Sequence, residues 1–120
     1  MPLKHESEFF LSRPIYAHIH TDALSHNLER IRQLVPGSKV WSVVKANAYG
    51  HGTIEIATAL APVAPAFGVA CIEEAIALRE ANIKQPILLL EGTFTADEVA
   101  LAEHHNLWLM VENQPQLDAI

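Results

Sequence analysis

A lysine, a tyrosine and two glycines lie close together in the segment VVKANAYGHG, residues 43–52. Lys45 ends an apolar run, and Tyr49 follows it by four residues. A lysine amine can attack a carbonyl carbon, and a tyrosine hydroxyl can donate a hydrogen bond. The glycines permit a tight turn before a helix that begins near Thr53, whose N-terminus favours an anion. The spacing fits a site for a carbonyl compound, but it also fits an ordinary lysine at a strand end, so both interpretations stay open.

The composition limits the classes of protein to which the chain can belong. Half of its 120 residues are hydrophobic and 18% are charged, which is enough to bury a core. The net charge is -6 and the basic residues are scattered, unlike the basic patch of a nucleic-acid-binding protein. No apolar stretch reaches the roughly 18 to 20 residues of a membrane helix, and the first ten residues do not resemble a secretory signal. We therefore expect a cytoplasmic protein that binds neither nucleic acid nor a membrane.

The elements that must position Lys45 follow an alternating pattern of short apolar runs and helical repeats. This alternation predicts strands joined by helices. Strands are expected over residues 15–19, 40–44, 67–70, 87–90 and 107–111. Helices are expected over residues 21–35, 53–60, 71–82 and 95–106, and a further helix is expected to begin after Asn113.

Successive strand–helix units of this kind form parallel sheets with right-handed crossovers. A doubly wound sheet carries a G-x-G-x-x-G loop after an early strand, and the sequence YGHGTI lacks the third glycine. A closed barrel needs eight units and about 250 residues. We therefore expect an α/β fold that is the N-terminal part of a TIM (β/α)8 barrel, with about five parallel strands. Residues 1–12 are expected to be an N-terminal extension, and residues 13–120 a truncated barrel domain of a longer protein.

The segment VVKANAYGHG resembles the cofactor-attachment segment of alanine racemases, which depend on pyridoxal 5'-phosphate. The resemblance extends over nearly the whole chain from about Arg13. RPIYAHIHTDALSHNLERIRQLVPGSKV is similar to the family's first strand and helix, and AFGVACIEEAIALREANIKQPILLLEG to its third strand through its fourth. WLMVENQPQLDAI is similar to its fifth strand. Related barrels with a cofactor lysine, such as the basic amino-acid decarboxylases, usually share only a segment like VKAN.

The resemblance implies roles for three residues of this segment. Lys45 matches the lysine that binds pyridoxal phosphate covalently, Tyr49 the tyrosine that contacts its phosphate, and Val43 a residue beside its pyridine ring. It also implies interconversion of L-alanine and D-alanine for peptidoglycan, with Lys45 as the base on the face that handles the D-antipode. Complete members carry a C-terminal β domain, which is absent from this chain, and work as head-to-tail homodimers.

Several groups that the family needs have no match in this chain. The base opposite the lysine is a tyrosine from the partner's C-terminal domain, and neither Tyr16 nor Tyr49 matches it. The arginine that faces the pyridine nitrogen and most phosphate-binding groups come from later strands. We therefore expect these 120 residues alone to lack racemase activity. The alternatives are another cofactor-lysine enzyme, either a racemase of broad specificity or a decarboxylase, and a non-catalytic half-barrel that self-associates.

Other polar residues receive no catalytic assignment. His18 and His20 alternate along an expected strand, but no further ligand stands at metal-binding spacing, so we expect no metal site. Cys71 and Glu91 fall at the ends of expected strands, and the single cysteine rules out an intrachain disulfide. Glu73 and Glu74 begin a helix, where acidic side chains stabilise the N-terminus.

Overall fold

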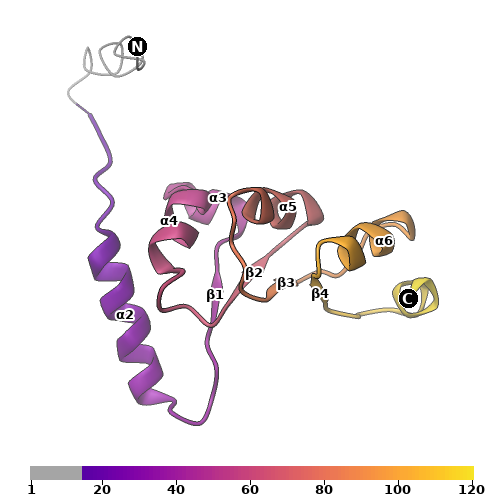
Figure 1. Ribbon diagram of the computed structural model, residues 1–120, viewed down its shortest axis with the longest axis horizontal. Coiled ribbons are helices and arrows are strands. Elements are labelled where there is room, and N and C mark those ends of the chain that lie inside the picture. The colour runs from indigo at the N-terminus through magenta and orange to yellow at the C-terminus, as the bar shows by residue number, and fades with distance from the viewer. Residues whose placement is uncertain (1–14) are drawn as a thin grey trace.

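A four-stranded parallel sheet is the centre of the computed structural model, which describes residues 15–120. The strands lie in the order β1-β2-β3-β4; one helix precedes the first strand, and helices follow each strand along the chain (Figure 1). The α/β fold class and the parallel sheet are therefore confirmed. The strands are β1 (Trp41–Val43), β2 (Ala66–Val69), β3 (Ile87–Leu89) and β4 (Trp108–Leu109). The helices are α2 (Thr21–Leu34), α3 (Lys45–Gly50), α4 (Thr53–Leu60), α5 (Ile72–Glu80), α6 (Asp97–His104) and α7 (Gln114–Ala119).

One face of the sheet forms the core with the helices that connect its strands. Phe67, Val69, Ile87 and Leu89 alternate along β2 and β3, and their side chains have no exposed surface. They belong to one apolar cluster that includes Leu78 of α5. Burying a side chain of this size contributes about 1.5–3 kcal/mol to the free energy of unfolding, so this face supplies much of the stability.

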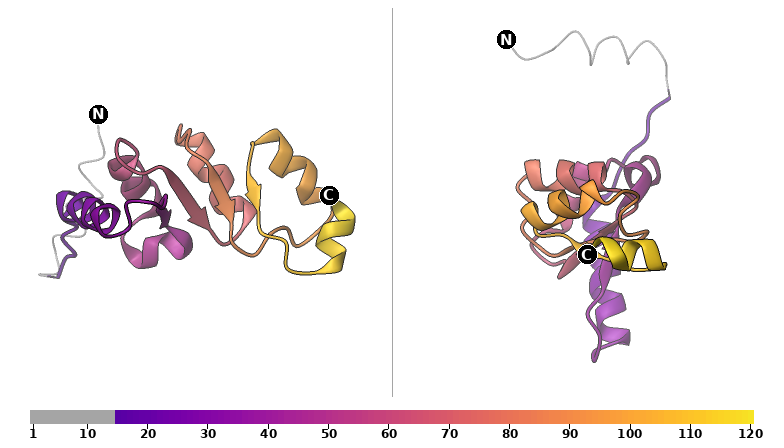
Figure 2. Two further views of the ribbon diagram at one scale, coloured as in Figure 1. Left: turned by 90° about the horizontal axis from the view of Figure 1, so that it is seen from below. Right: turned by 90° about the vertical axis from the view of Figure 1, so that its right-hand side faces the viewer.

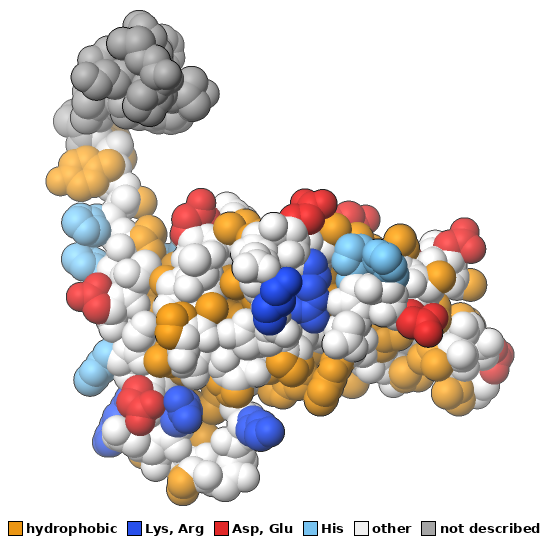
Figure 3. Space-filling view, viewed as in Figure 1, with side chains coloured by type: hydrophobic (Ala, Val, Ile, Leu, Met, Phe, Trp, Pro, Cys, Tyr) orange, Lys and Arg blue, Asp and Glu red, His pale blue; other side chains and the backbone are white. Residues whose placement is uncertain are grey.

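The other face of the sheet is concave and partly exposed. The rings of Trp41 and Trp108 lie 5.4 Å apart between centroids, although β2 and β3 separate their strands. Neighbouring strands are about 4.8 Å apart, so a flat sheet would keep these two strands near 14 Å apart. The short ring distance shows that the two indoles lean toward each other across this face, as expected where a sheet curves into the wall of a barrel. Figure 2 shows the strands side by side in chain order, and Figure 3 shows apolar side chains gathered along the lower edge of the molecule.

The strand that we expected over residues 15–19 does not form. Residues 15–20 have no regular structure, and Ile15 and Tyr16 are 84% and 86% exposed. Apolar alternation predicts a strand only where a sheet edge and a packing surface are available to it. In the described part of the chain β1 pairs with β2 alone, and the segment extends from the N-terminal end of α2 away from the sheet (Figure 1). The extension expected over residues 1–12 falls outside the described residues.

The expected helices form close to their expected positions. The helix expected to follow Asn113 is α7, and the Asn113 side chain caps it by accepting a hydrogen bond from the Gln116 N–H at 2.9 Å. In helix α2 the Leu28 side chain is buried, whereas the Ile31 side chain is 46% exposed. None of the helices within residues 15–120 has the length and apolar character needed to cross a membrane.

Candidate active site

Lys45 lies at the C-terminal end of β1, two residues after the strand's last residue. Val44, between them, is buried, and its N–H donates to the Gly68 carbonyl of β2 at 2.9 Å. Val43 is 51% exposed, and Lys45 is partly exposed. Active sites of barrels and open α/β sheets form at this edge, so the structure places the lysine where the sequence predicted it.

The segment after Lys45 is a left-handed turn. Ala46, Asn47, Ala48 and Tyr49 have φ values of 50–55° and ψ values of 37–50°, so α3 is not an ordinary right-handed helix. Left-handed helical conformation costs about 1–2 kcal/mol for each residue with a Cβ atom. Strain of this kind persists only where the surroundings enforce it, and it is concentrated at functional sites. The sequence indicated a turn at the glycines but not this strained turn before them.

Local hydrogen bonds join the left-handed turn to the start of α4. The Asn47 side chain accepts a hydrogen bond from the Thr53 N–H at 3.2 Å. The Thr53 hydroxyl donates to the Val44 carbonyl at 2.7 Å, and the His51 Nδ1 atom lies 2.8 Å from the Ala48 carbonyl oxygen. These contacts give His51 a role in shaping the loop and close the turn on itself.

Glu74 supplies a contact from outside the loop. Its Oε1 accepts a hydrogen bond from the Ala46 N–H, and its Oε2 accepts one from the Ala70 N–H, both at 2.8 Å. The two amides follow the ends of β1 and β2. Sequence reasoning assigned Glu74 only to the helix N-terminus, because contacts between residues 28 positions apart leave no local pattern.

Val43 and Tyr49 both line a small cavity of about 170 Å³, together with Leu24 of α2. The Tyr49 side chain is 73% exposed. On the concave face, a Cβ atom at Gly68 would lie 3.5 Å from a Val43 methyl carbon and 3.6 Å from one of Leu90, so these side chains converge over the glycine. Leu90 is therefore a neighbour of the candidate site that the sequence did not reveal.

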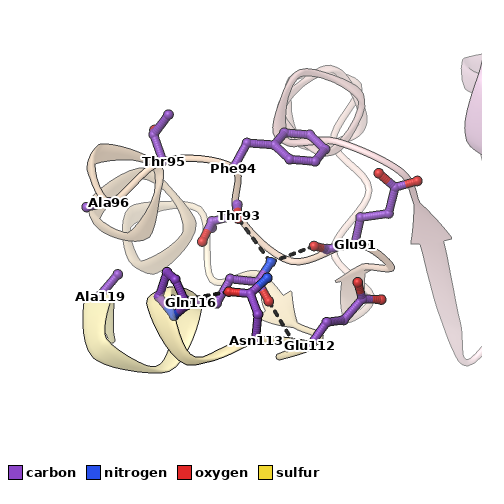
Figure 4. Close-up of a pocket in the computed structure, with 10 residues that line it drawn as sticks. Glu91, Thr93, Phe94, Thr95, Ala96, Glu112, Asn113, Gln116 and Ala119 are labelled. Atoms are coloured by element: carbon purple, nitrogen blue, oxygen red, sulfur yellow. Dashed lines mark hydrogen bonds between the residues drawn. The ribbon is translucent and has the colours of Figure 1, made fainter.

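A second, larger cleft of about 550 Å³ lies at the same edge of the sheet, among the loops after β3 and β4 (Figure 4). Gln116 is buried at this cleft; its Nε2 donates to the carbonyls of Glu91 (2.8 Å) and Thr93 (3.1 Å), and its Oε1 accepts from the Glu112 N–H at 2.7 Å. The amide therefore ties the two loops together. The exposed Glu91 carboxylate lies at this cleft and not in the small cavity beside Val43.

The remaining candidate residues do not form a site among the described residues. The rings of His18 and His20 stack with centroids 4.5 Å apart, and no group of three or more potential metal ligands occurs within residues 15–120. Burial is the main cause of a raised pKa for the Cys71 thiol, and a raised pKa reduces the thiolate fraction that would act as a nucleophile.

Three comparisons place the chain among known proteins. Residues 19–120 match the family model described as alanine racemase, N-terminal domain. An alanine racemase of Chromohalobacter salexigens is 52% identical over 110 residues, which are 92% of this chain and 30% of the relative. The alanine racemase structure from Acinetobacter baumannii superposes with a TM-score of 0.81 at 42% identity, covering 84% of this chain and 30% of that one.

A histidine racemase structure from Leuconostoc mesenteroides subsp. sake also superposes, with a TM-score of 0.73 at 32% identity, covering 82% of this chain and 27% of that one. The chain thus spans about a third or less of the length of these relatives. The family match covers most of the chain and includes the whole Lys45 segment. The chain belongs to the alanine racemase N-terminal domain family.

Proposed function

We propose that this chain is the cofactor-anchoring part of an alanine racemase, which interconverts L-alanine and D-alanine. The observation that carries the proposal is the position of Lys45, at the C-terminal end of a parallel strand and at the start of a strained left-handed turn. The membership of the family supports the activity, and the strained turn supports a function for this segment in particular.

The residues of the segment fit pyridoxal 5'-phosphate as the cofactor. The Lys45 amine has the chemistry to bond to an aldehyde carbon, the exposed Tyr49 hydroxyl can donate to a phosphate, and Val43 offers an apolar surface to the ring. When bound, the cofactor supplies a ring that takes up the negative charge developing at the substrate α-carbon.

Lys45 also acts as an acid and base in this proposal. Its Nζ accepts a proton from the α-carbon of one enantiomer and returns a proton to the same face in the reverse reaction. Inversion needs a second group on the opposite face, which we assign to a tyrosine of the partner subunit in a homodimer. D-alanine made in the cytoplasm then serves peptidoglycan synthesis.

A second candidate function is a racemase that acts on amino acids other than alanine. The similarity to a histidine racemase favours it, because the part of the fold that this chain supplies is shared by a histidine racemase and an alanine racemase. Turnover of the full-length protein with alanine, histidine and other amino acids distinguishes the two. Rapid turnover of alanine alone supports the first proposal, and comparable turnover of several substrates supports the second.

The direct test of cofactor anchoring is reduction of the protein with borohydride in the presence of pyridoxal phosphate. We expect one adduct in the intact mass, mapped to Lys45 and lost in Lys45→Ala. Lys39 and Lys84 are exposed lysines on the same chain and serve as internal controls. Equal labelling of Lys39, Lys45 and Lys84 would contradict the proposal.

A further inference from the structure

The Glu74 carboxylate connects two loops that leave the sheet at the edge where Lys45 lies. One oxygen binds the amide that follows Lys45, and the other binds the amide that follows β2. Hydrogen bonds from backbone amides to a carboxylate are charge-assisted, and the 2.8 Å distances are typical of strong ones.

Glu74 differs from every other group that holds the left-handed turn. The other hydrogen bonds to residues 46–49 come from Val44, His51, Gly52 and Thr53, all of which lie within the same loop. Within residues 15–120, Glu74 is the one hydrogen-bonding partner of the turn that comes from a separate element. It therefore fixes the turn relative to the sheet, whereas the local bonds fix only its internal shape.

The amide that Glu74 binds belongs to the peptide that joins Lys45 to Ala46. Rotation of this peptide redirects the Lys45 side chain, and relaxation of the strained turn behind it moves Tyr49 relative to Lys45. A small misplacement of a reacting group lowers the rate of a reaction strongly, while the affinity for substrate changes less.

We propose that Glu74 is a positioning residue for Lys45, which it holds through the Ala46 amide. This inference rests on the proposed function of Lys45, and it goes beyond it by assigning the orientation of the lysine to a helix outside the loop. Glu74 takes no proton from the substrate in this proposal.

Glu73 provides a matched control. Both glutamates occupy the first turn of α5, so both interact with the same helix N-terminus. Glu73 is exposed, and no hydrogen bond joins it to residues 45–52 in the described part of the chain. Any effect of helix-end charge alone is therefore common to Glu73→Gln and Glu74→Gln.

The test compares Glu74→Ala, Glu74→Gln and Glu73→Gln in the full-length protein. Hydrogen–deuterium exchange of the cofactor-free protein reports the Ala46 and Ala70 amides, and steady-state kinetics of the loaded protein report kcat and KM. The absorption band of the bound cofactor reports the environment of Lys45. Glu74→Gln keeps one oxygen that can accept an amide, so it also serves if Glu74→Ala fails to fold.

We expect Glu74→Ala to speed exchange at Ala46 and Ala70 by about tenfold or more and to lower kcat by roughly ten- to a hundredfold, with a smaller change in KM. Glu74→Gln should be intermediate, the cofactor band should shift in both variants, and Glu73→Gln should match the unmodified protein. Unchanged exchange at Ala46, or equal losses of kcat in Glu73→Gln and Glu74→Gln, would overturn the inference. Absence of a Lys45 adduct in the unmodified protein would instead refute the proposed function, and the exchange comparison would still decide whether Glu74 holds the turn.

Discussion

Helix α5 binds loops at both ends of the sheet, through Glu74 in its first turn and Arg79 in its last turn. Glu74, in its first turn, accepts amides after the C-terminal ends of β1 and β2. Arg79, in its last turn, donates to carbonyls before the N-terminal ends of β3 and β4. Loops that enter helices present free N–H groups, and loops that leave helices present free carbonyls. An anion therefore suits one edge and a cation the other.

The two contacts differ in what they hold. Arg79 makes four hydrogen bonds of 2.8–2.9 Å, to the carbonyls of Ile83, Gln85, His105 and Asn106. Two of these carbonyls lie before β3 and two before β4, so one guanidinium joins two loops. Glu74 makes two hydrogen bonds, one of which ends on a strained turn. The comparison shows that more hydrogen bonds hold the loops before β3 and β4, whereas Glu74 holds a strained turn after β1.

The largest expected effect on stability comes from Arg79, at the N-terminal ends of the strands. Arg79→Met removes a donor from four backbone carbonyls, and we expect the free energy of unfolding to fall by about 3 kcal/mol. Urea unfolding of both proteins measures this change in the free energy of unfolding. Arg30→Met is the control, since Arg30 is exposed and makes one side-chain bond at 3.3 Å. Equal losses in the two variants would mean that the bonds of Arg79 add nothing beyond an ordinary surface arginine.

Replacing Gly92 tests how tightly the loops at the C-terminal ends of the strands are packed. Its φ is +69°, and a Cβ atom there would collide with the Met110 carbonyl oxygen and with Nε2 of Gln116. We expect Gly92→Ala to lower the free energy of unfolding by about 2–3 kcal/mol. Gly37→Ala, where a Cβ atom meets nothing within 4 Å, is the control. A loss confined to Gly37→Ala would contradict this account of the loop.

We expect the loss of the Glu74 contact to change the free energy of unfolding only modestly, although it lowers kcat strongly. We expect Glu74→Ala to lower the free energy of unfolding by about 1–2 kcal/mol, because two charge-assisted hydrogen bonds are lost but the released turn relieves part of its strain. Thermal unfolding of Glu74→Ala and Arg79→Met side by side measures the difference between the two edges. A larger loss at Glu74 than at Arg79 would reverse the comparison.

The sequence predicted what depends on local pattern and motif. The alternation of apolar runs predicted β1 to β4 and their helices, and the VVKANAYGHG segment predicted the position of Lys45. It failed where the outcome depends on distant partners. Residues 15–19 were expected to form a strand but do not pair with the open edge of β1, and the contact of Glu74 with Ala46 spans 28 positions. The left-handed turn was also not predicted, because alanine and tyrosine have no preference for positive φ values.

Cys71 gives the smallest and most local test of the C-terminal edge. It follows Ala70, and burial is the main cause of its raised pKa; the backbone N–H of Glu74 opposes the rise, and the negative charges of Glu73 and Glu74 add to it. A pKa raised by folding contributes stability that is present at low pH and is lost as the pH rises through the folded pKa.

We expect alkylation of Cys71 in the folded protein to reach its half-maximal rate at a higher pH than alkylation in urea. Glu74→Gln should move that midpoint slightly down, because a negative charge beside the thiol is removed, whereas Glu103→Gln on α6 should leave it in place. Coincident midpoints for the folded and unfolded chains would show that this edge is too open to perturb a thiol, and the contrast with the Arg79 edge would then rest on hydrogen bonds alone.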